Sequence, residues 1–367
     1  MRAAVLEAAG KPLVIRDDVD IVEPRAGEVR VRVKYCSLCH SDLSVVDGTM
    51  PLLELPIIVG HEAAGIVESV GPGVSDLAPG DPVVLTPAPP CGRCYHCQRG
   101  QQHHCVNSQG IMTNRFPDGS TGLSVGGQEV MRGMGVGALA EYVVTSVNGA
   151  IKVPEDVPLN VACVIGCALQ TGVGAVLNTA GVEEGATVLI LGAGGIGISA
   201  IQGARLAGAA KIIVSDPNPQ RREAAQHFGA THLLDPGSQD VLTEVMALTD
   251  NIGVDYGFET AGVAALISVG LDATRTGGKM VCVGAPPLEE SLTIPSAVIF
   301  AVSGKSLCGC LLGSCNSPRD IPRLVSLWQA GKLDLDNMVT GQRPLEEVNE
   351  GMDDLAAGRG IRTVIAL

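Results

Sequence analysis

The chain has 367 residues, enough for two or three domains with a sizeable interior, and its 46% hydrophobic but only 2% aromatic content requires a largely aliphatic core. A net charge of −14 leaves no basic stripe that could follow a nucleic-acid backbone or an anionic membrane surface. We therefore expect small-molecule partners and further copies of the chain itself, with no nucleic acid and no membrane.

The start of the chain, residues 1–7, lacks the apolar run and small-residue cleavage site of a secretory signal. Twelve cysteines could form disulfides in a secreted protein, but clustered thiols without such a signal favour metal ligands kept reduced in the cytosol. We expect a cytoplasmic protein. Two uncharged stretches, 157–182 and 185–204, have membrane-spanning length. We interpret both as buried segments of a folded domain, because polar residues and glycines interrupt them.

Short β-rich runs separated by Pro and Gly turns occupy residues 2–153, for example 29–33 and 65–70, and predict an irregular antiparallel β domain. From about residue 185, strands alternate with helical spacers. This alternation predicts a doubly wound, parallel, six-stranded Rossmann sheet. The expected strands are 187–191, 211–215, 231–234, 254–258, 279–283 and 306–311.

The tail from about residue 313 does not continue this alternation. It contains an amphipathic run at 321–330 and a final strand at 363–367. We expect the tail to return to the first domain.

A glycine-rich turn follows the expected strand 187–191 and opens a helical stretch at 198–207, which is the context that a dinucleotide-binding turn requires. In this turn Gly192 permits the tight bend, Gly194 lets the backbone approach a pyrophosphate, and Gly197 allows close helix packing. Gly195 and Ile196 complete the candidate cofactor-binding turn.

Asp216 ends the next expected strand, where a carboxylate can accept hydrogen bonds from the adenosine ribose and repel a 2′-phosphate. We therefore favour NAD over NADP. Two alternatives stay open: Asp216 could be a helix cap or a surface carboxylate, and Arg221 and Arg222 are near enough to weaken the repulsion.

Four cysteines within 15 residues follow the spacing C-x2-C-x2-C-x7-C: Cys91, Cys94, Cys97 and Cys105. Thiolates this close, in a loop of Gly, Pro and polar residues, are better explained by a shared metal ion than by packing. The alternatives are paired disulfides and an iron–sulfur cluster, although the C-x3-C-P ending of the bacterial cluster sequence is missing. We predict a structural zinc ion, closed by four ligands.

A second metal site can be assembled from Cys39, His61 and Cys167, which are distant in sequence. A catalytic zinc ion requires three protein ligands and one open position, and two thiolates with one imidazole balance its charge. Taken singly, His61 or Cys167 could equally be an ordinary buried residue.

Several motifs together resemble the zinc-containing alcohol dehydrogenases of the medium-chain dehydrogenase/reductase family, nearly from end to end. They are Cys39-His-Ser-Asp42, Gly60-His-Glu-Ala-Ala-Gly-Ile-Val-Glu68, the cysteine quartet, Ile165-Gly-Cys167 with Thr171-Gly172, Leu191-Gly-Ala-Gly-Gly-Ile-Gly197 and Ile361-Arg-Thr363. The Cys2His ligand set is itself the one established for alcohol dehydrogenase, so the second metal site is not independent of this resemblance.

The resemblance implies a discontinuous GroES-like catalytic domain, residues 1–168 and 312–367, with two zinc sites, and a coenzyme domain at 169–311. It also implies a substrate cleft at the domain junction and a homodimer or homotetramer formed through the coenzyme domains.

By matching motif, Cys39, His61 and Cys167 resemble the catalytic zinc ligands, Asp42 the carboxylate that orients the histidine, and Glu62 the acidic neighbour of the zinc. Ser41 resembles the hydroxyl that takes the substrate proton. The positions that resemble cofactor contacts are Thr171 and Ile196 at the nicotinamide, His40 at the pyrophosphate, and Arg221 and Arg362.

The chain departs from its relatives around the substrate. Ser44 stands where many relatives carry a proton-relaying histidine. Relatives that bind glutathione carry charged residues at positions that correspond here to Met50, Leu52 and Gln109, and an aromatic position appears as Pro87. We therefore expect an apolar, roomy pocket for a primary or bulky hydrophobic alcohol.

Three hypotheses of function follow. The first is a zinc- and NAD-dependent alcohol dehydrogenase, and the second is a formaldehyde dehydrogenase that uses a thiol other than glutathione. The third is a non-catalytic NAD-binding protein with a structural or sensing role. A cofactor that stays bound and needs an external hydride acceptor is also compatible with the sequence.

Overall fold

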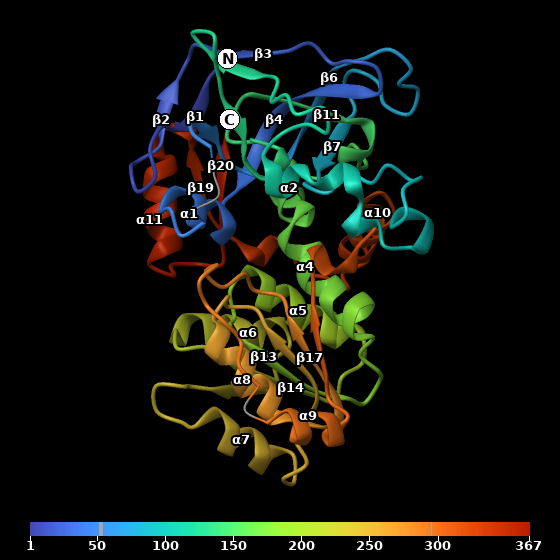
Figure 1. Cartoon of the computed structure of the whole chain (residues 1–367), viewed down its shortest axis with the longest axis vertical. Helices are drawn as coiled ribbons and strands as arrows, with labels where there is room; N and C mark the ends of the chain where they lie inside the picture. The colour runs from blue at the N-terminus through green and yellow to red at the C-terminus, as the bar shows by residue number, and fades with distance from the viewer. Residues whose placement is uncertain (51–53, 295) are drawn as a thin grey trace. The chain divides into compact units, whose positions relative to one another are not determined.

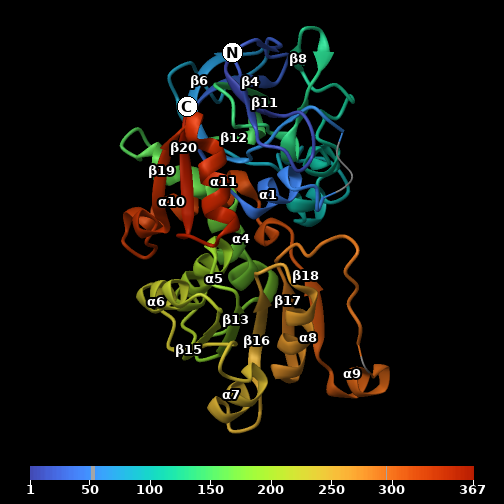
Figure 2. The same cartoon turned by 90° about the vertical axis from the view of Figure 1, so that its left-hand side faces the viewer.

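The computed structural model describes residues 1–50, 54–294 and 296–367. The chain divides into two compact units, one made of Met1–Gln170 with Cys315–Leu367 and the other of Thr171–Ser314 (Figures 1 and 2). The sequence predicts division after residues 168 and 311, whereas these units divide after 170 and 314.

The first unit is organised around a seven-stranded sheet in the order β12-β7-β6-β4-β20-β19, with β11 also paired to β4. Its pairs are antiparallel except for β19 with β20. Along β4, Val29, Val31 and Val33 are buried, which is the period of two expected of a strand with one core-facing side. The strands are β4 (Glu28–Ser37), β6 (Glu62–Val70), β7 (Pro82–Leu85), β11 (Tyr142–Ser146), β12 (Ala150–Lys152), β19 (Val339–Pro344) and β20 (Arg362–Ala366).

Two smaller sheets and several short helices complete this unit. One sheet has the order β10-β5-β1-β2 and the other the order β3-β8-β9. Their strands are β1 (Ala3–Leu6), β2 (Val14–Arg16), β5 (Ile57–Ile58), β10 (Met131–Arg132), β3 (Val19–Ile21), β8 (Leu123–Val125) and β9 (Gln128–Glu129). The helices are α1 (His40–Val46), α2 (Gly110–Thr113), α3 (Leu159–Ala162), α10 (Ser317–Gln329) and α11 (Val348–Ala356), and α4 (Ala168–Gly174) crosses into the second unit.

The C-terminal tail does return to the first unit, where the red β20 lies beside the blue β4 in Figure 1. The pairing is antiparallel and sets Ile365 opposite Cys36. The amphipathic run predicted at 321–330 is part of α10, which begins four residues earlier, at Ser317. Pro318 in the first turn suits a helix start, because its missing N–H would have no intrahelical partner there.

The second unit is a parallel six-stranded sheet in the order β15-β14-β13-β16-β17-β18. This order is that of a doubly wound Rossmann sheet, so the predicted fold class is confirmed. The strands are β13 (Thr187–Leu191), β14 (Lys211–Ser215), β15 (His232–Leu234), β16 (Val254–Glu259), β17 (Thr274–Cys282) and β18 (Ser306–Gly309). The helices are α5 (Gly195–Leu206), α6 (Pro219–Phe228), α7 (Val241–Leu248), α8 (Ala264–Ala273) and α9 (Ala297–Ser303).

The fifth strand, β17, begins five residues before its predicted start at 279. The strand runs through Gly277 and Gly278, before the predicted start, with a shifted register against β16. Gly277 has φ +74°, a value that glycine tolerates at such an irregularity.

No single helix among the described residues is long and apolar enough to cross a membrane. Leu159–Gly166 and Ala168–Ala180 meet the length and composition test only as a pair, and a bend of 50° separates them. Residues 161–176 are buried, in agreement with our interpretation of this stretch as an interior segment.

Candidate metal and coenzyme sites

Cys39, His61 and Cys167 come together in the first unit. Their sulfur and ring-nitrogen atoms lie within 4.8 Å of one another, and all three side chains are buried. A hydrogen bond from Cys167 lowers the pKa of Cys39 well below its usual value, despite burial. Two thiolates and one imidazole this close together fit a zinc ion, which these three side chains would hold.

Asp42 holds two of these residues. Its Oδ1 accepts the Gly60 N–H at 2.8 Å and lies 3.1 Å from His61 Nδ1, and its Oδ2 accepts the Cys39 N–H at 3.2 Å. Because Nδ1 of His61 faces Asp42, the other ring nitrogen, Nε2, is the atom that can bind a metal ion. The carboxylate is 1% exposed, so water does not compete for these contacts.

The turn before β6 requires glycine at position 60. Gly60 has φ +96°, and a Cβ there would lie 2.7 Å from the Leu139 backbone nitrogen. Such a side chain would be both strained and in collision. Gly60 therefore allows His61 to lie close to α1 and Asp42.

Glu62 and Arg362 form a buried ion pair within the first unit. Arg362 Nε lies 3.2 Å from Glu62 Oε1, with side chains 3% and 0% exposed, although neither atom has a partner in hydrogen-bonding geometry. Glu62 Oε2 accepts the N–H of Ala168, the residue after Cys167. Burial raises the pKa of Glu62. The pair thus connects β6, β20 and the start of α4 beside the metal cluster.

Besides Asp42, three predicted residues lie on α1, which Cys39 precedes. Ser41 Oγ is 3.8 Å from Cys39 Sγ, so the structure brings this hydroxyl beside the cluster. Ser41 and Ser44 are half-buried, and His40 is exposed at the first helical position.

The cysteine quartet forms a second cluster. The sulfurs of Cys91, Cys94, Cys97 and Cys105 lie within 4.8 Å of one another. The backbone N–H groups of Cys91 and Asn107 donate to Cys105 Sγ at 3.1 and 3.4 Å. Backbone N–H groups of Cys97 and Val106 lower the pKa of Cys94 to about 6.

N–H donors of this kind stabilise thiolates, the form that binds zinc. All twelve cysteines are free, so the paired-disulfide alternative is not what the structure contains.

The glycine turn of the second unit has the expected geometry. Gly192 has φ +97°, and a Cβ on Gly197 would lie 2.0 Å from the Gly192 carbonyl oxygen. A Cβ on Gly194, by contrast, would meet nothing within 4 Å. This open space lies at the N-cap of α5, where backbone N–H groups without helical partners can bind a pyrophosphate.

Asp216 follows β14 and is 3% exposed, and the N-cap of α6 is Asn218. Asp216 is thus neither a surface carboxylate nor the cap of that helix. Its Oδ2 accepts the Ala193 N–H at 2.7 Å and its Oδ1 accepts the Asn218 N–H at 2.8 Å, which joins it to the glycine turn. Arg222 lies beside Asp216, as the sequence suggested: its Nη1 donates to the Asp216 carbonyl at 2.6 Å, and its Nη2 pairs with Asp235 at 2.9 Å.

Two other residues that the sequence predicts to contact the cofactor each have a buried polar atom without a hydrogen-bond partner. These atoms are Thr171 Oγ1 and Arg221 Nε. Such atoms are costly unless something binds them, so a bound nucleotide fits this unit. Ile196 is half-buried in the first turn of α5.

The sequence did not single out Glu259, at the carboxyl end of β16. Its Oε1 accepts the N–H groups of Ala261, Gly262 and Val263 at 2.7 to 3.2 Å. The neighbouring Thr260 hydroxyl donates to the carbonyls of Leu191 and Gly192. Glu259 therefore holds the segment 261–263, and Thr260 joins that segment to the glycine turn. In the sequence, the acidic residue directly after a predicted parallel strand could have indicated this role.

Two family models match the chain. Residues 25–155 match the GroES-like domain of alcohol dehydrogenases, and residues 195–330 match the zinc-binding dehydrogenases. With the two cysteine-containing clusters and the parallel sheet, these matches define a zinc-containing dehydrogenase.

Individual relatives cover nearly the whole chain. It is 38% identical to S-(hydroxymethyl)glutathione dehydrogenase of Paracoccus denitrificans, over 99% of both chains. It is also 38% identical to the NDMA-dependent alcohol dehydrogenase of Amycolatopsis methanolica, over 99% of this chain and 98% of the relative. The crystal structure of benzyl alcohol dehydrogenase from Acinetobacter calcoaceticus superimposes with TM-score 0.92 at 32% identity, over 100% and 99% of the chains.

The chain belongs to the zinc-dependent medium-chain alcohol dehydrogenase family, whose members are oxidoreductases acting on CH–OH donors. Zinc and NAD, the cofactors predicted from the sequence, are those of this family.

Proposed function

We propose that the chain is an NAD-dependent dehydrogenase that reversibly oxidises a primary or bulky hydrophobic alcohol to its aldehyde or ketone. The observation that carries this proposal is the convergence of Cys39, His61 and Cys167, with His61 held by Asp42. A zinc ion bound there supplies a Lewis acid, which in the case of water lowers the pKa of a bound hydroxyl from about 16 to about 7.

In this proposal the Ser41 hydroxyl accepts the proton that the alcohol loses while it donates its own proton to water. Its hydroxyl lies beside the Cys39 sulfur and is half-buried, so it lies near both the metal ligands and solvent. Ser44 lacks the basic ring nitrogen on which a histidine would hold that proton, because a hydroxyl keeps no second proton near neutral pH. We therefore propose that water carries the proton onward from Ser41.

The coenzyme proposal assigns the pyrophosphate to the turn Gly192–Gly197 and the adenosine ribose to Asp216. A bound NAD would supply the nicotinamide ring as the hydride acceptor. The orphaned Thr171 hydroxyl supports a contact with the nicotinamide, and the orphaned Arg221 Nε supports a contact on the adenosine side. His40, Ile196 and Arg362 complete the proposed cofactor contacts.

The positions at which glutathione-binding relatives carry charged residues are uncharged in this chain. Met50 packs against the apolar core of the first unit, Pro87 is buried, and Gln109 carries no charge. Leu52 lies outside the described residues. Uncharged residues at these positions favour a hydrophobic alcohol over a charged glutathione adduct as the substrate.

A second candidate is a formaldehyde dehydrogenase that uses a thiol other than glutathione. The 38% identity to S-(hydroxymethyl)glutathione dehydrogenase favours it. A non-catalytic role has no comparable support, because the relatives named above are dehydrogenases.

We also propose that the chain forms homo-oligomers through its second unit. Val298, Ile299 and Val302 on α9 are 65 to 77% exposed. Among the described residues β18 pairs only with β17, so its outer edge is open. An apolar patch beside an open strand edge is typical of an interface.

The test is an assay of zinc-loaded protein with a panel of aliphatic and aromatic alcohols, with NAD or NADP, and with or without formaldehyde plus low-molecular-weight thiols. NDMA is added in a parallel series, because one relative is named for its dependence on it. We expect NAD-linked turnover of hydrophobic alcohols without thiol. Activity restricted to formaldehyde with a thiol would favour the second candidate instead.

A further inference from the structure

Arg132 is a buried cation that forms no direct ion pair in the part of the chain that the structure describes; the carboxylate that acts on it from a distance, Glu28, is itself paired with Arg25. Its side chain is 3% exposed. Nη2 donates to the Val144 carbonyl at 2.6 Å, whereas Nε and Nη1 have no partner. A buried guanidinium with two unsatisfied nitrogens destabilises the fold unless something binds it.

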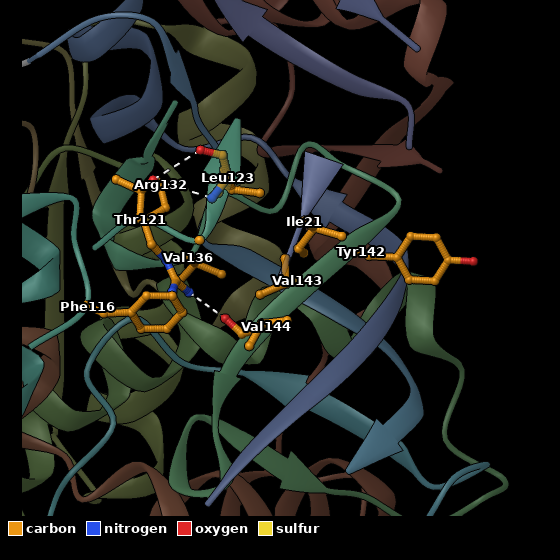
Figure 3. A pocket seen from close by; sticks show the side chains of 11 residues that line it. Ile21, Phe116, Thr121, Leu123, Arg132, Val136, Tyr142, Val143 and Val144 are labelled. Carbon is orange, nitrogen blue, oxygen red and sulfur yellow. Dashed lines mark hydrogen bonds between the residues drawn. The ribbon is translucent and has the colours of Figure 1, made fainter. Parts of the chain in front are cut away.

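An aromatic ring covers one side of this cation. The guanidinium carbon lies 3.7 Å from the centre of the Phe116 ring, and Figure 3 shows the two side chains against each other with the bond to Val144. A second guanidinium, that of Arg25, lies 4.8 Å from the same ring. The ring attracts cations but carries no net charge, so Arg132 still lacks an anion.

Arg25 does not share this need. It pairs with Glu28 and Asp118. Burial lowers the pKa of Arg132 to about 9, which is still above neutral pH, so the group is charged. The positive charge of Arg132 is therefore not removed by loss of its proton.

Two cavities adjoin Arg132. The one drawn in Figure 3 has a volume of about 10 Å³, is mainly apolar and holds about one water molecule. The other has a volume of about 120 Å³, enough for several waters or a small polyatomic ion. Its polar lining includes Arg115, Thr145, Ser146 and Asn148. Arg115 is paired with Glu54 and Glu129, so the unbalanced charge in the lining is that of Arg132.

We propose that the larger cavity beside Arg132 is a binding site for one small oxyanion, such as sulfate, phosphate or a carboxylate. The anion accepts hydrogen bonds from the guanidinium, in a cavity whose lining also includes the polar residues Asn107 and Asn148. Nη2 has a second N–H besides the one given to Val144, and together with the free Nε or Nη1 it can offer an oxyanion two parallel N–H bonds. The site lies wholly in the first unit and is independent of the proposed dehydrogenase activity.

The experiment measures the thermal midpoint of the zinc-loaded protein with sulfate, phosphate or acetate replacing chloride at constant ionic strength. NADH is present throughout, so that its pyrophosphate occupies the other expected anion site. Sulfate stabilises folded proteins in general, so the signal is a saturable shift that depends on Arg132. We expect about 2–4 °C for wild type and none for Arg132→Met.

Arg99→Met is the matched control, because it also removes a guanidinium stacked on an aromatic ring, that of Tyr95, but in an exposed position. It should keep the full shift. Titration calorimetry of the NADH-saturated wild-type protein with sulfate should give one site per chain, whether or not Arg132→Met folds.

Sulfate and phosphate acting without acetate would assign the site to tetrahedral anions, and acetate acting alone would assign it to carboxylates. An equal shift in Arg132→Met would overturn the proposal. So would no saturable binding to wild type, which would mean that the cavity holds water, or that the zinc-bound quartet, whose Cys91 also lines it, supplies the counter-charge.

Discussion

Asp42 shows how a single buried carboxylate can define a metal site. It contacts the backbone of Cys39, the backbone of Gly60 and the ring of His61. The three contacts fix two ligands from segments that are distant in the chain. Because the carboxylate is 1% exposed, each bond forms in a low dielectric, where it is strengthened.

The first prediction concerns Asp42→Asn. The amide keeps the shape but cannot accept at both oxygens, so the ring of His61 loses its orientation. We expect zinc affinity at the Cys39–His61–Cys167 site to fall by about 10- to 100-fold, with a parallel loss of turnover. Metal analysis after dialysis measures the first effect, and NADH fluorescence should show unchanged coenzyme binding.

Asp47→Asn is the matched control, because Asp47 ends the same helix and contacts only Thr49 with its side chain. This variant should keep both zinc ions and full turnover. Retention of both zinc ions by Asp42→Asn would contradict the role of Asp42.

The second prediction concerns Asp216→Asn. The amide oxygen can still accept the Ala193 N–H, so the glycine turn should keep its shape. The negative charge that opposes a 2′-phosphate is lost, and we expect the ratio of kcat/KM for NADP to that for NAD to rise by about tenfold or more. Steady-state kinetics with both coenzymes measures the ratio.

Glu223→Gln removes one charge from the exposed side of α6 and should leave the coenzyme ratio unchanged. An equal rise in both variants would show that overall charge, and not Asp216, controls coenzyme choice.

At the scale of elements, the sequence predicted the second unit closely and the first only in outline. The strands 187–191 and 211–215 matched to the residue, because buried parallel strands are short apolar runs bounded by turn residues. In the first unit, very short strands such as β5 and β10 contain too few residues to show the alternation of apolar and polar side chains that identifies a strand in the sequence. Their pairing depends on partners far along the chain.

The candidate sites divide in the same way. The cysteine quartet and the glycine turn are local in sequence, and spacing alone indicates them. The Cys39, His61 and Cys167 set needed the family resemblance, because no spacing rule links those positions. Arg132 and Phe116 gave no signal, since a buried guanidinium stacked on a ring depends on tertiary packing.

The third prediction compares two glycines of one turn. Gly197→Ala should lower the free energy of unfolding by about 1–3 kcal/mol, because its Cβ would lie 2.0 Å from the Gly192 carbonyl. Gly194→Ala has open space and an ordinary φ of −73°, so its stability should not change. Its methyl group would instead occupy the space proposed for the pyrophosphate.

Thermal unfolding and NADH titration of the two variants measure the contrast. We expect Gly194→Ala to unfold like wild type while binding NADH more weakly. Unchanged NADH affinity in that variant would contradict the proposed position of the coenzyme.

The fourth prediction concerns the cysteine quartet. Cys94→Ala should reduce the zinc content from two ions to one and lower the thermal midpoint, because a closed structural site contributes to folding. Cys308→Ala in β18 is the control and should keep both ions. A Cys94→Ala protein with two tightly bound ions would contradict the assignment.

At the scale of the whole molecule, two units with separate cores are joined by a chain that crosses between them twice, at 170/171 and 314/315. Both crossings start from one buried network in the first unit. The Ser317 hydroxyl contacts Gln170 Oε1 and Thr86 Oγ1, and Cys315 Sγ lies 3.3 Å from the Gln170 carbonyl. The discontinuous first unit is thus closed by its own hydrogen bonds where the chain leaves and returns.

The last prediction concerns assembly and uses Val302→Asp. Helix α9 is anchored by Phe300, which packs on the core of the second unit, while Val302 is 77% exposed. On a free surface this substitution would change the free energy of unfolding by no more than about 0.5 kcal/mol. In an interface between copies it would bury an unpaired carboxylate, which is far more costly. We therefore expect wild type to be a dimer or tetramer by light scattering, and Val302→Asp to dissociate on dilution.

Met112→Asp, at a site 71% exposed in the first unit, should assemble like wild type. A monomeric wild type, or equal assembly of all three proteins, would exclude α9 as part of the interface.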